Sequence, residues 1–178
     1  MVTVVQSPAI SLEEFSNQPL DHIEWIDGKL IEKPEMTAKT GRIQARLARY
    51  WGNHKDATHQ GGEVYTETHC RTVGCTRCPD VAYLAPNLVA QYGDFEVLPH
   101  SFSLVAEIVS PTDIAEEVFT KAREYLESAC QEVWLIFPDS QWVLVITPQQ
   151  QKLYGMSNIV STQNVLVDFN IAVNELIA

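Results

Sequence analysis

The sequence predicts an α/β (α+β) fold in which helices flank a mixed β-sheet and a hairpin lies near the N-terminus. Two observations favour this class. The stretches from residue 37 to about 54 and from residue 113 to about 129 have apolar side chains at helical spacing. Short apolar segments lie around these helices, and one of them, residues 103–109, is apolar nearly throughout, which is typical of a strand covered on both faces.

The first expected elements are a short helix and a hairpin. Ser11 is followed three residues later by Glu14, the pattern of a capping box that begins a helix. Residues 22–33, HIEWIDGKLIEK, alternate apolar and polar side chains on both sides of Asp27-Gly28. Because Asp-Gly tolerates the positive φ angles of a tight turn, this stretch predicts two antiparallel strands.

The helix expected from residue 37 to about 54 is amphipathic. Its apolar side consists of Ile43, Leu47, Tyr50 and Trp51. Its basic side consists of Arg42, Arg46 and Arg49. These arginines are candidates to contact phosphate groups, but a helix side rich in arginine is also common where the helix only faces water, so both interpretations stay open.

The remaining elements are predicted from alternation, turn residues and helical spacing. Pro111 ends one strand, and Asp113 is placed to cap the helix that runs to about residue 129. Gly74 and residues 138–140 mark turns. The expected strands are residues 63–70, 80–84, 103–109, 132–137, 141–147, 152–156 and 165–169.

The length of 178 residues and the apolar content of 46% predict a single domain, residues 1–178, with one core. The longest apolar runs, such as residues 104–109, are far shorter than a membrane span. The N-terminal stretch MVTVVQSPAISLEEF lacks the basic start and apolar centre of a secretory signal. We therefore expect a cytoplasmic protein with no membrane partner, whose four cysteines are reduced thiols.

The formal net charge of −11 disfavours non-specific binding to nucleic acid, because that binding depends mainly on cations that neutralise phosphates. A local basic groove or a bound divalent metal ion can reverse the sign where it matters. The sequence lacks the motifs GxGxxG, GxxxxGK[ST], HExxH and GxSxG. Nucleotide-cofactor enzymes, zinc proteases and serine hydrolases therefore have no support.

Two carboxylates lie in segments that otherwise predict buried strands. Asp80 opens a strand within CPDVAYLAP, and Glu107 lies in SLVAEIVS. A buried ionised carboxylate needs a proton, a cation or a metal ion. If the two strands are neighbours, both carboxylates converge on one point and predict a Mg²⁺ site, since Mg²⁺ prefers oxygen ligands. The alternatives are a turn residue at the start of a strand for Asp80 and an ion pair with an arginine for Glu107.

A cation for this site is available on the following helix. Lys121, in TKAREYL, is placed to approach the acidic pair, with Tyr125 one turn further on the same side. A lysine there stabilises phosphate charge and helps to activate a water molecule. Glu117 lies four residues before Lys121, so an ordinary exposed helix pair of about 0.3–0.5 kcal/mol is the alternative.

Five segments in the same order resemble the Uma-type putative restriction endonuclease family, a bacterial branch of the PD-(D/E)xK nuclease superfamily. They are EWIDGKLIE, PDVAYL, LVAEIVSPTD, KAREYL and EVWLIFPD. The resemblance covers nearly the whole chain from Ser11 and implies a restriction-endonuclease-like core. It also implies a homodimer, because related folds usually work in pairs.

The resemblance implies roles for individual residues. Asp80 matches the family's metal-binding aspartate, and Glu107 matches its second acidic ligand. Lys121 matches the family's lysine, which lies on the helix after this acid, and Tyr125 matches the tyrosine that accompanies it. Glu24 matches a recurrent upstream glutamate with a supporting role.

The function expected from these roles is that of an endonuclease that hydrolyses phosphodiester bonds of nucleic acid, in the first place DNA. Mg²⁺ or Mn²⁺ would be held by Asp80, Glu107 and the backbone carbonyl of Ile108. Lys121 would orient the attacking water.

Two departures from the family pattern point to an alternative. The family commonly has a histidine-glutamine pair where this chain has Thr40-Gly41-Arg42, and its usual glycine after the lysine helix is replaced within Ser128-Ala129-Cys130. The first change is expected to affect the site, and the second is expected to be structural. The altered helix start and the acidic surface favour a catalytically inactive binding or scaffold protein of the nuclease fold. A hydrolase of another substrate, for instance a glycosidase with two carboxylates, is a third alternative.

A second group of residues offers ligands for zinc. His69, Cys70, Cys75 and Cys78 include a Cys-x-x-Cys pair near another cysteine and a histidine. Reduced thiols around a turn are the favoured interpretation, because the adjacent His69 and Cys70 point to opposite faces of a strand.

Overall fold

The computed structural model describes residues 4–5 and 10–178. The helices are α1 Leu12–Asn17, α2 Ala38–Ala57, α3 Pro86–Tyr92, α4 Ala115–Glu127 and α5 Val173–Ile177. The strands are β1 Val4–Val5, β2 Ile23–Ile26, β3 Lys29–Glu32, β4 Glu63–Thr66, β5 His69–Thr72, β6 Cys75–Arg77, β7 Val81–Leu84, β8 Val97–Leu98, β9 Leu104–Ile108, β10 Glu132–Phe137, β11 Trp142–Ile146, β12 Gln151–Tyr154, β13 Ile159–Ser161 and β14 Asn170–Ala172. No helix in this part of the chain is long and apolar enough to cross a membrane. Much of the segment expected to lack a secretory signal, residues 1–3 and 6–9, lies outside the described residues.

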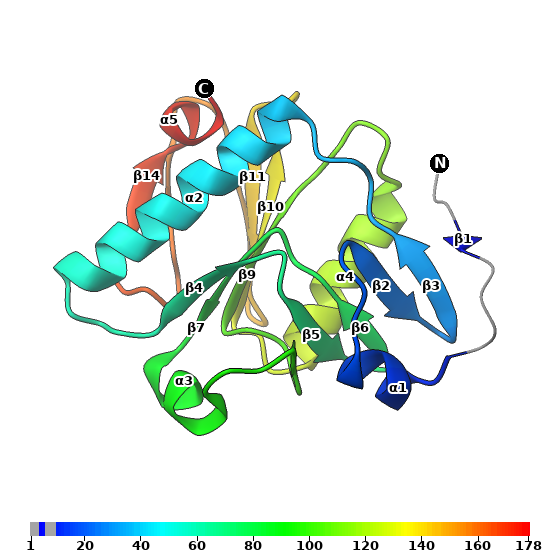
Figure 1. Ribbon diagram of the computed structural model, residues 1–178. Helices are drawn as coiled ribbons and strands as arrows, with labels where there is room; N and C mark the ends of the chain where they lie inside the picture. The colour runs from blue at the N-terminus through cyan, green and yellow to red at the C-terminus, as the bar shows by residue number, and fades with distance from the viewer. Residues whose placement is uncertain (1–3, 6–9) are drawn as a thin grey trace.

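Two larger sheets make up the fold. The central sheet has the strand order β12-β11-β10-β9-β7-β4, and the second sheet has the order β1-β3-β2-β6-β5-β8. In the central sheet β9 is parallel to β10 and antiparallel to β7, so the sheet is mixed, as the sequence predicts. Figure 1 shows α2 and α5 over one face of the central sheet and α4 behind it, beside the second sheet.

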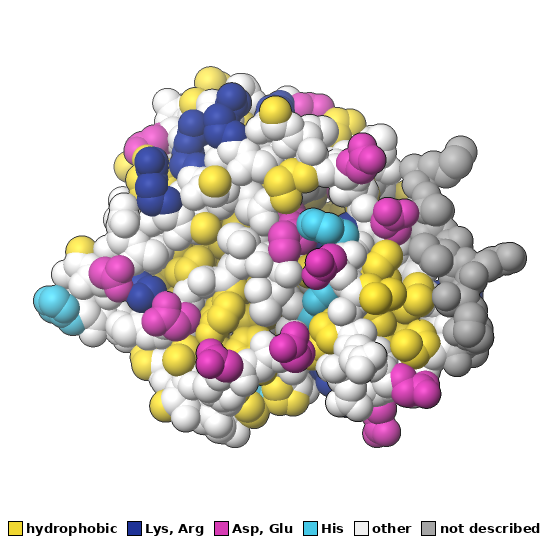
Figure 2. Space-filling model, viewed as in Figure 1, with side chains coloured by type: hydrophobic (Ala, Val, Ile, Leu, Met, Phe, Trp, Pro, Cys, Tyr) yellow, Lys and Arg dark blue, Asp and Glu magenta, His cyan; other side chains and the backbone are white. Residues whose placement is uncertain are grey.

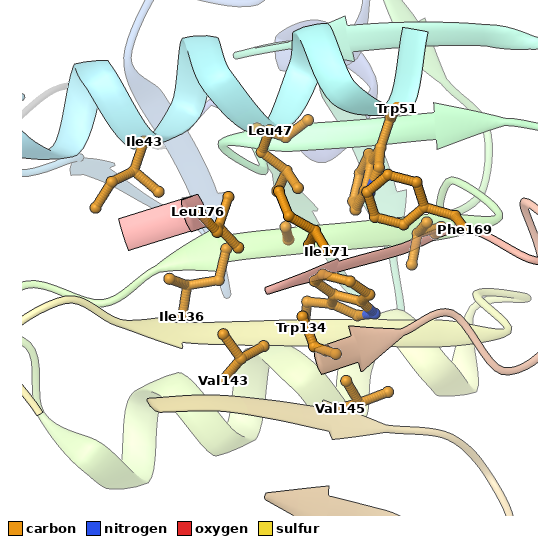
Figure 3. Close-up of a cluster of buried hydrophobic side chains, with 14 of the residues drawn as sticks. Ile43, Leu47, Trp51, Trp134, Ile136, Val143, Val145, Phe169, Ile171 and Leu176 are labelled. Carbon is orange, nitrogen blue, oxygen red and sulfur yellow. The ribbon is translucent and has the colours of Figure 1, made fainter. Parts of the chain in front are cut away.

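Both faces of the central sheet are covered by apolar side chains. On one face Ile43, Leu47 and Trp51 of α2 pack on the sheet, and the rings of Trp51 and Trp134 meet edge to face at 5.9 Å between centroids (Figure 3). On the other face α4 packs against residues that include Val105. Because side chains alternate along a strand, this burial explains why β9 is apolar nearly throughout. It also directs Glu107 to the α4 face.

The N-terminal expectations are confirmed. The side chain of Ser11 accepts a hydrogen bond from the amide of Glu14, whose carboxylate accepts one from the amide of Ser11, which is the capping box of α1. β2 and β3 form the hairpin, and Asp27 and Gly28 have φ angles of 49° and 81°. These positive angles are the ones that a tight turn of this kind requires.

The expected strand at residues 63–70 is wrong, because it consists of two strands in different sheets. β4 lies at the edge of the central sheet, whereas β5 belongs to the second sheet. Between them Glu67 has a φ angle of 48° and turns the chain from one sheet to the other. The alternation of side chains continues through this bend, so the pattern does not reveal it.

The expected strand at residues 165–169 is also wrong. Leu166 and Asp168 have φ angles of 49° and 66°, so this stretch between β13 and β14 bends. The side chains of Val165, Leu166 and Phe169 pack in the core that α2 covers, whereas Val167 is exposed. The sequence patterns also predict none of the strands β1, β6, β8, β13 and β14 and neither of the helices α3 and α5. Pro86 stands at the first position of α3, where its fixed φ angle favours a helix, so a signal for this helix was present.

The expected cap of α4 is displaced by one residue. The N-cap position is occupied by Ile114, which has no capping side chain. Asp113 instead accepts a hydrogen bond of 2.8 Å from the amide of Ser110 and stabilises the turn before the helix. The prediction of Asp113 as the cap is therefore wrong, although its carboxylate does bind a backbone amide.

Candidate active site

The strand register brings Asp80 and Glu107 together. β7 and β9 are antiparallel neighbours in which Val81 pairs with Ala106, so the next pair in this register is Asp80 and Glu107. Residues opposite each other in an antiparallel pair point to the same face, here the face covered by α4. The expectation that the two strands are neighbours is confirmed, and both carboxylates are buried.

Two side chains of α4 approach Glu107, one as a hydrogen-bond donor and one as a cation. The hydroxyl of Tyr125 donates a hydrogen bond of 2.6 Å to its Oε1, and Nζ of Lys121 lies 4.0 Å from the same oxygen. Burial raises the pKa of Glu107 to about 7, while the charge of Lys121 opposes this shift and that of Asp80 adds to it. The negative charge of Glu107 is therefore incompletely compensated, and a further cation nearby would be favourable.

Lys121 lies in the site and not on the helix surface. Its Nζ is 2.9 Å from Oε1 of Glu24, so its partners are Glu24 and Glu107, and the alternative pair with Glu117 is not formed. Burial lowers the pKa of Lys121, but the negative charges of Glu107 and Glu24 raise it by more, so the pKa lies above its ordinary value. The ammonium group is therefore charged at neutral pH.

Glu24 is held by cations on both sides. Besides Lys121, its carboxylate accepts hydrogen bonds from Nη1 of Arg77 at 2.9 Å and from the amide of Cys78 at 3.2 Å. Burial raises the pKa of Glu24, but the charges of Lys121 and Arg77 lower it more, to about 2. Arg77 was not predicted. The alternative of an ion pair between Glu107 and an arginine is not found among the described residues, and Arg77 binds Glu24 and Glu124.

Lys33, the residue after β3, brings a second ammonium group to the site. Its Nζ donates hydrogen bonds to Oδ1 of Asp80 at 2.9 Å, to Oε2 of Glu67 at 2.7 Å and to the backbone carbonyl of Cys78 at 2.7 Å. Burial lowers the pKa of Lys33, but the carboxylates around it, Asp80 first, raise it well above its ordinary value. The Lys33 ammonium group therefore supplies a cation at the start of the buried strand β7, directly beside the carboxylate of Asp80.

Further hydrogen bonds fix the position of Asp80. Its Oδ2 accepts a hydrogen bond of 2.7 Å from the amide of Ile108. The side chain of Gln44, on the buried side of α2, donates to the backbone carbonyl of Asp80 at 2.9 Å and to Oε1 of Glu67 at 3.1 Å. The role predicted for the carbonyl of Ile108 is a separate matter and stays a prediction.

Sequence reasoning missed Lys33, Glu67 and Gln44. Lys33 lies 47 residues before Asp80 in the chain, and no spacing rule connects them. Gln44 left a weak signal, since it lies next to Ile43 on the side of the helix that faces the core. A polar residue at such a position usually has a buried hydrogen-bond partner.

The oxygen donors fit a hard divalent cation. Among the residues that the structure describes, no group of three or more His, Cys, Asp or Glu side chains is arranged to hold a metal ion. Two carboxylates are sufficient for Mg²⁺, which keeps several water molecules and is usually bound through one or two carboxylates. The pair of Asp80 and Glu107 meets this requirement, and the incompletely compensated charge of Glu107 favours an added cation.

The zinc alternative receives no support from the geometry. The ring of His69 donates a hydrogen bond of 2.7 Å to the backbone carbonyl of Ile23. The four cysteines are free and buried. Zinc in a structural site takes four protein ligands, and no such group exists within residues 4–5 and 10–178.

The basic side of α2 has two kinds of arginine. Nη1 of Arg46 donates to the backbone carbonyls of Glu175 and Leu176 at 2.9 and 3.0 Å and so holds the end of α5. Arg42 and Arg49 are exposed. Figure 2 shows Lys and Arg side chains gathered at the upper left of this view, near α2, while acidic side chains are scattered over the whole face. Arg46 has a structural role, and the other two remain available to contact phosphates.

Known proteins similar to this chain include one family and one solved structure. The model of a family described as Uma2, putative restriction endonuclease, matches residues 11–174. A crystal structure of a putative nuclease belonging to DUF820 from Anabaena variabilis ATCC 29413 matches with a TM-score of 0.83 and 23% sequence identity, over 94% of this chain and 97% of that chain. Comparison with curated proteins gave no match. The structural likeness confirms the mixed α/β architecture predicted from the sequence.

Proposed function

The chain belongs to the Uma2 family of putative restriction endonucleases, and from this premise we propose that it is a metal-dependent endonuclease that hydrolyses phosphodiester bonds, in the first place those of DNA. The observation that supports this most is the position of Asp80 opposite Glu107, with the ammonium group of Lys121 4.0 Å from Glu107. Phosphodiester hydrolysis generates negative charge that cations must stabilise. A pair of carboxylates beside an ammonium group suits that chemistry.

Asp80 and Glu107, together with the backbone carbonyl of Ile108, would hold Mg²⁺ or Mn²⁺. When bound, such an ion lowers the pKa of a water molecule and neutralises charge on the phosphate. The protein's part is to present carboxylate oxygens from two rigid, hydrogen-bonded strands. Asp80 is fixed by the amide of Ile108, and Glu107 is fixed by the hydroxyl of Tyr125.

Lys121 would orient the attacking water and stabilise the phosphate. Its ammonium group is 2.9 Å from Oε1 of Glu24 and 4.0 Å from Oε1 of Glu107. Glu24 is therefore its nearer partner and holds it in position beside Glu107. Glu24 therefore positions Lys121, and Tyr125 positions Glu107. These two roles need no direct contact with the substrate.

The proposal extends to the surroundings of the site. Exposed Arg42 and Arg49 would help an acidic protein to hold the nucleic acid backbone. We propose further that residues 1–178 form one domain, which acts as a homodimer in the cytoplasm. Sedimentation at several concentrations measures the oligomeric state directly.

A second candidate function is that of a catalytically inactive binding protein with the nuclease fold. The specific observation that favours it is the ammonium group of Lys33, which already neutralises Asp80 at 2.9 Å. Such a protein would bind nucleic acid, or metal ions, without cleavage.

A cleavage assay distinguishes the two candidates. Supercoiled plasmid and single-stranded DNA and RNA are incubated with the wild type, Glu107→Gln and Lys121→Met, in Mg²⁺, in Mn²⁺ and in EDTA. Lys152→Met is the matched control, because Lys152 lies on the edge strand β12 over the ring of Tyr154. Cleavage that needs a metal ion and is lost only in the first two variants supports the endonuclease. Binding without any cleavage supports the second candidate.

A further inference from the structure

The ammonium group of Lys33 lies in a cage of oxygen atoms. Within 2.9 Å of its Nζ are one carboxylate oxygen of Asp80, one of Glu67 and the backbone carbonyl of Cys78. The side chain of Lys33 is only 10% exposed, so few water molecules share these contacts. Two carboxylates and a carbonyl are also the kinds of ligand that a hard metal ion prefers.

Each oxygen of Asp80 already has a partner. Oδ1 accepts from Lys33, and Oδ2 accepts from the amide of Ile108. The amide belongs to the sheet and cannot leave, whereas the lysine side chain can rotate. A divalent ion that approaches Asp80 therefore meets the positive charge of Lys33 first, and the two cations repel each other at this distance.

The ammonium group of Lys33 keeps other hydrogen-bond partners when it leaves Asp80. Glu67 and the carbonyl of Cys78 remain as its partners, and Glu67 is itself held by the side chain of Gln44. Lys121 differs from Lys33 in this respect. It is bound to Glu24 and lies beside Glu107, so its removal does not release an oxygen of Asp80.

We propose that Lys33 is a positioning residue that acts as a built-in competitor of the divalent ion at Asp80. It holds the carboxylate of Asp80 in place in the absence of metal, and it weakens metal binding because the ion must displace its ammonium group from Asp80. This inference rests on the proposed metal dependence, since without a divalent ion at Asp80 there is nothing to compete with.

The test is calorimetric titration of Mn²⁺ into the wild type and Lys33→Met, a variant that keeps the length of the side chain and removes its charge. Lys55→Met is the matched control, because Lys55 is 12% exposed and also contacts two carboxylates, those of Asp56 and Glu63. We expect Lys33→Met to bind one Mn²⁺ per chain more tightly than the wild type by about tenfold or more, the scale on which groups beside a metal ligand change its affinity. Lys55→Met should bind like the wild type, and Asp80→Asn added to Lys33→Met should remove the gain.

Two further variants protect the test against a folding defect, because Lys33→Met leaves buried carboxylates without their cation. Lys33→Gln removes the charge but keeps a hydrogen-bond donor, and it should also bind Mn²⁺ more tightly. Lys33→Arg keeps the charge and should bind as weakly as the wild type. Thermal unfolding gives an independent readout, since Mn²⁺ should raise the melting temperature of the two neutral variants more than that of the wild type.

The outcomes separate this inference from the proposed function. Equal Mn²⁺ affinities for the wild type and both neutral variants overturn the inference and leave the metal-dependent nuclease standing. Binding that appears only in the neutral variants supports the inference and counts against metal dependence of the wild type. No binding by any of these proteins overturns both.

Discussion

Arg77 and Glu124 form a two-contact ion pair that fastens α4 to the second sheet. Nε and Nη2 of Arg77 in β6 donate to the two carboxylate oxygens of Glu124 at 2.7 and 2.9 Å. Glu124 lies on α4 between Lys121 and Tyr125, the two residues that approach Glu107. The same arginine also binds Glu24, so one guanidinium group fixes both the helix and the carboxylate that hold Lys121.

Arg77→Lys should therefore weaken both stability and activity. Lysine keeps the charge but cannot reproduce the planar two-contact geometry. We expect the free energy of unfolding in urea to fall by about 2 kcal/mol, within the range for hydrogen bonds to charged groups. The rate of cleavage should also fall, because Lys121 is no longer held firmly beside Glu107. Glu127→Gln, an exposed change on the same helix, is the control. An Arg77→Lys protein with wild-type stability and cleavage rate would contradict the role of Arg77 in positioning α4 and Glu24.

Glu24 gives a prediction for the dependence of stability on pH. Its pKa is lowered from 4.5 to about 2 in the folded protein, so its ionised form favours folding. This contribution is fully present above about pH 4.5 and is lost as the pH falls towards 2. Glu24→Gln should lower the free energy of unfolding at pH 7 by about 3 kcal/mol, and the difference from the wild type should shrink as the pH falls from 5 to 3.

Urea unfolding at a series of pH values measures this difference. Glu32→Gln is a suitable control, because Glu32 belongs to the same hairpin and is exposed. A gap between the wild type and Glu24→Gln that stays constant from pH 7 to pH 3 would contradict the assignment of a lowered pKa to Glu24.

The predictable part of the site consists of residues whose burial the sequence already reveals. Asp80 and Glu107 stand out because each is a charge at the start of or within an apolar segment. The sequence predicts the pairing of their strands only as a condition, which β7 and β9 meet in the structure. Lys121 was found only as one of two alternatives, because helical spacing cannot tell which carboxylate a lysine selects. In the structure the ammonium group of Lys121 contacts Glu24 and Glu107 and not Glu117.

The part that could not be predicted depends on where two sheets meet. Lys33 and Glu67 contact each other because the chain bends at Glu67 from the central sheet into the second one, and alternation carries no information about that bend. Arg77 lies in β6, a short strand that the sequence left as part of a turn region. Contacts between distant segments depend on the packing of the whole fold, which local patterns do not describe.

Tyr125→Phe tests how Glu107 is held. The ring of Tyr125 is completely buried and can remain in place, while the hydrogen bond of 2.6 Å to Glu107 is lost. We expect the cleavage rate to fall about 10- to 100-fold, the usual effect of removing a group that orients a metal ligand. Tyr65→Phe, whose ring packs against Phe102, should cleave at the wild-type rate. Single-turnover kinetics are the appropriate measurement. Equal cleavage rates for the two variants would contradict a role of the Tyr125 hydroxyl in cleavage.

The turn after α4 predicts a stabilising substitution. Ala129 follows the C-cap residue Ser128 and has a φ angle of 78°, which an alanine adopts only at a cost. The amide of Cys130 donates to the carbonyl of Tyr125 at 3.1 Å, the hydrogen bond of a Schellman motif, in which glycine normally occupies the position of Ala129.

Ala129→Gly should therefore raise the free energy of unfolding by about 0.5–1 kcal/mol, because glycine relieves the strained angle and the exposed methyl group makes little contact. Ala45→Gly, at an exposed position within α2, should have the opposite effect and lower it by about 1 kcal/mol, since glycine is unfavourable inside a helix. Urea unfolding of both variants checks the pair. A decrease for Ala129→Gly as large as that for Ala45→Gly would mean that backbone freedom in the unfolded chain outweighs the strain at this turn, and that the missing glycine is not a defect of the fold.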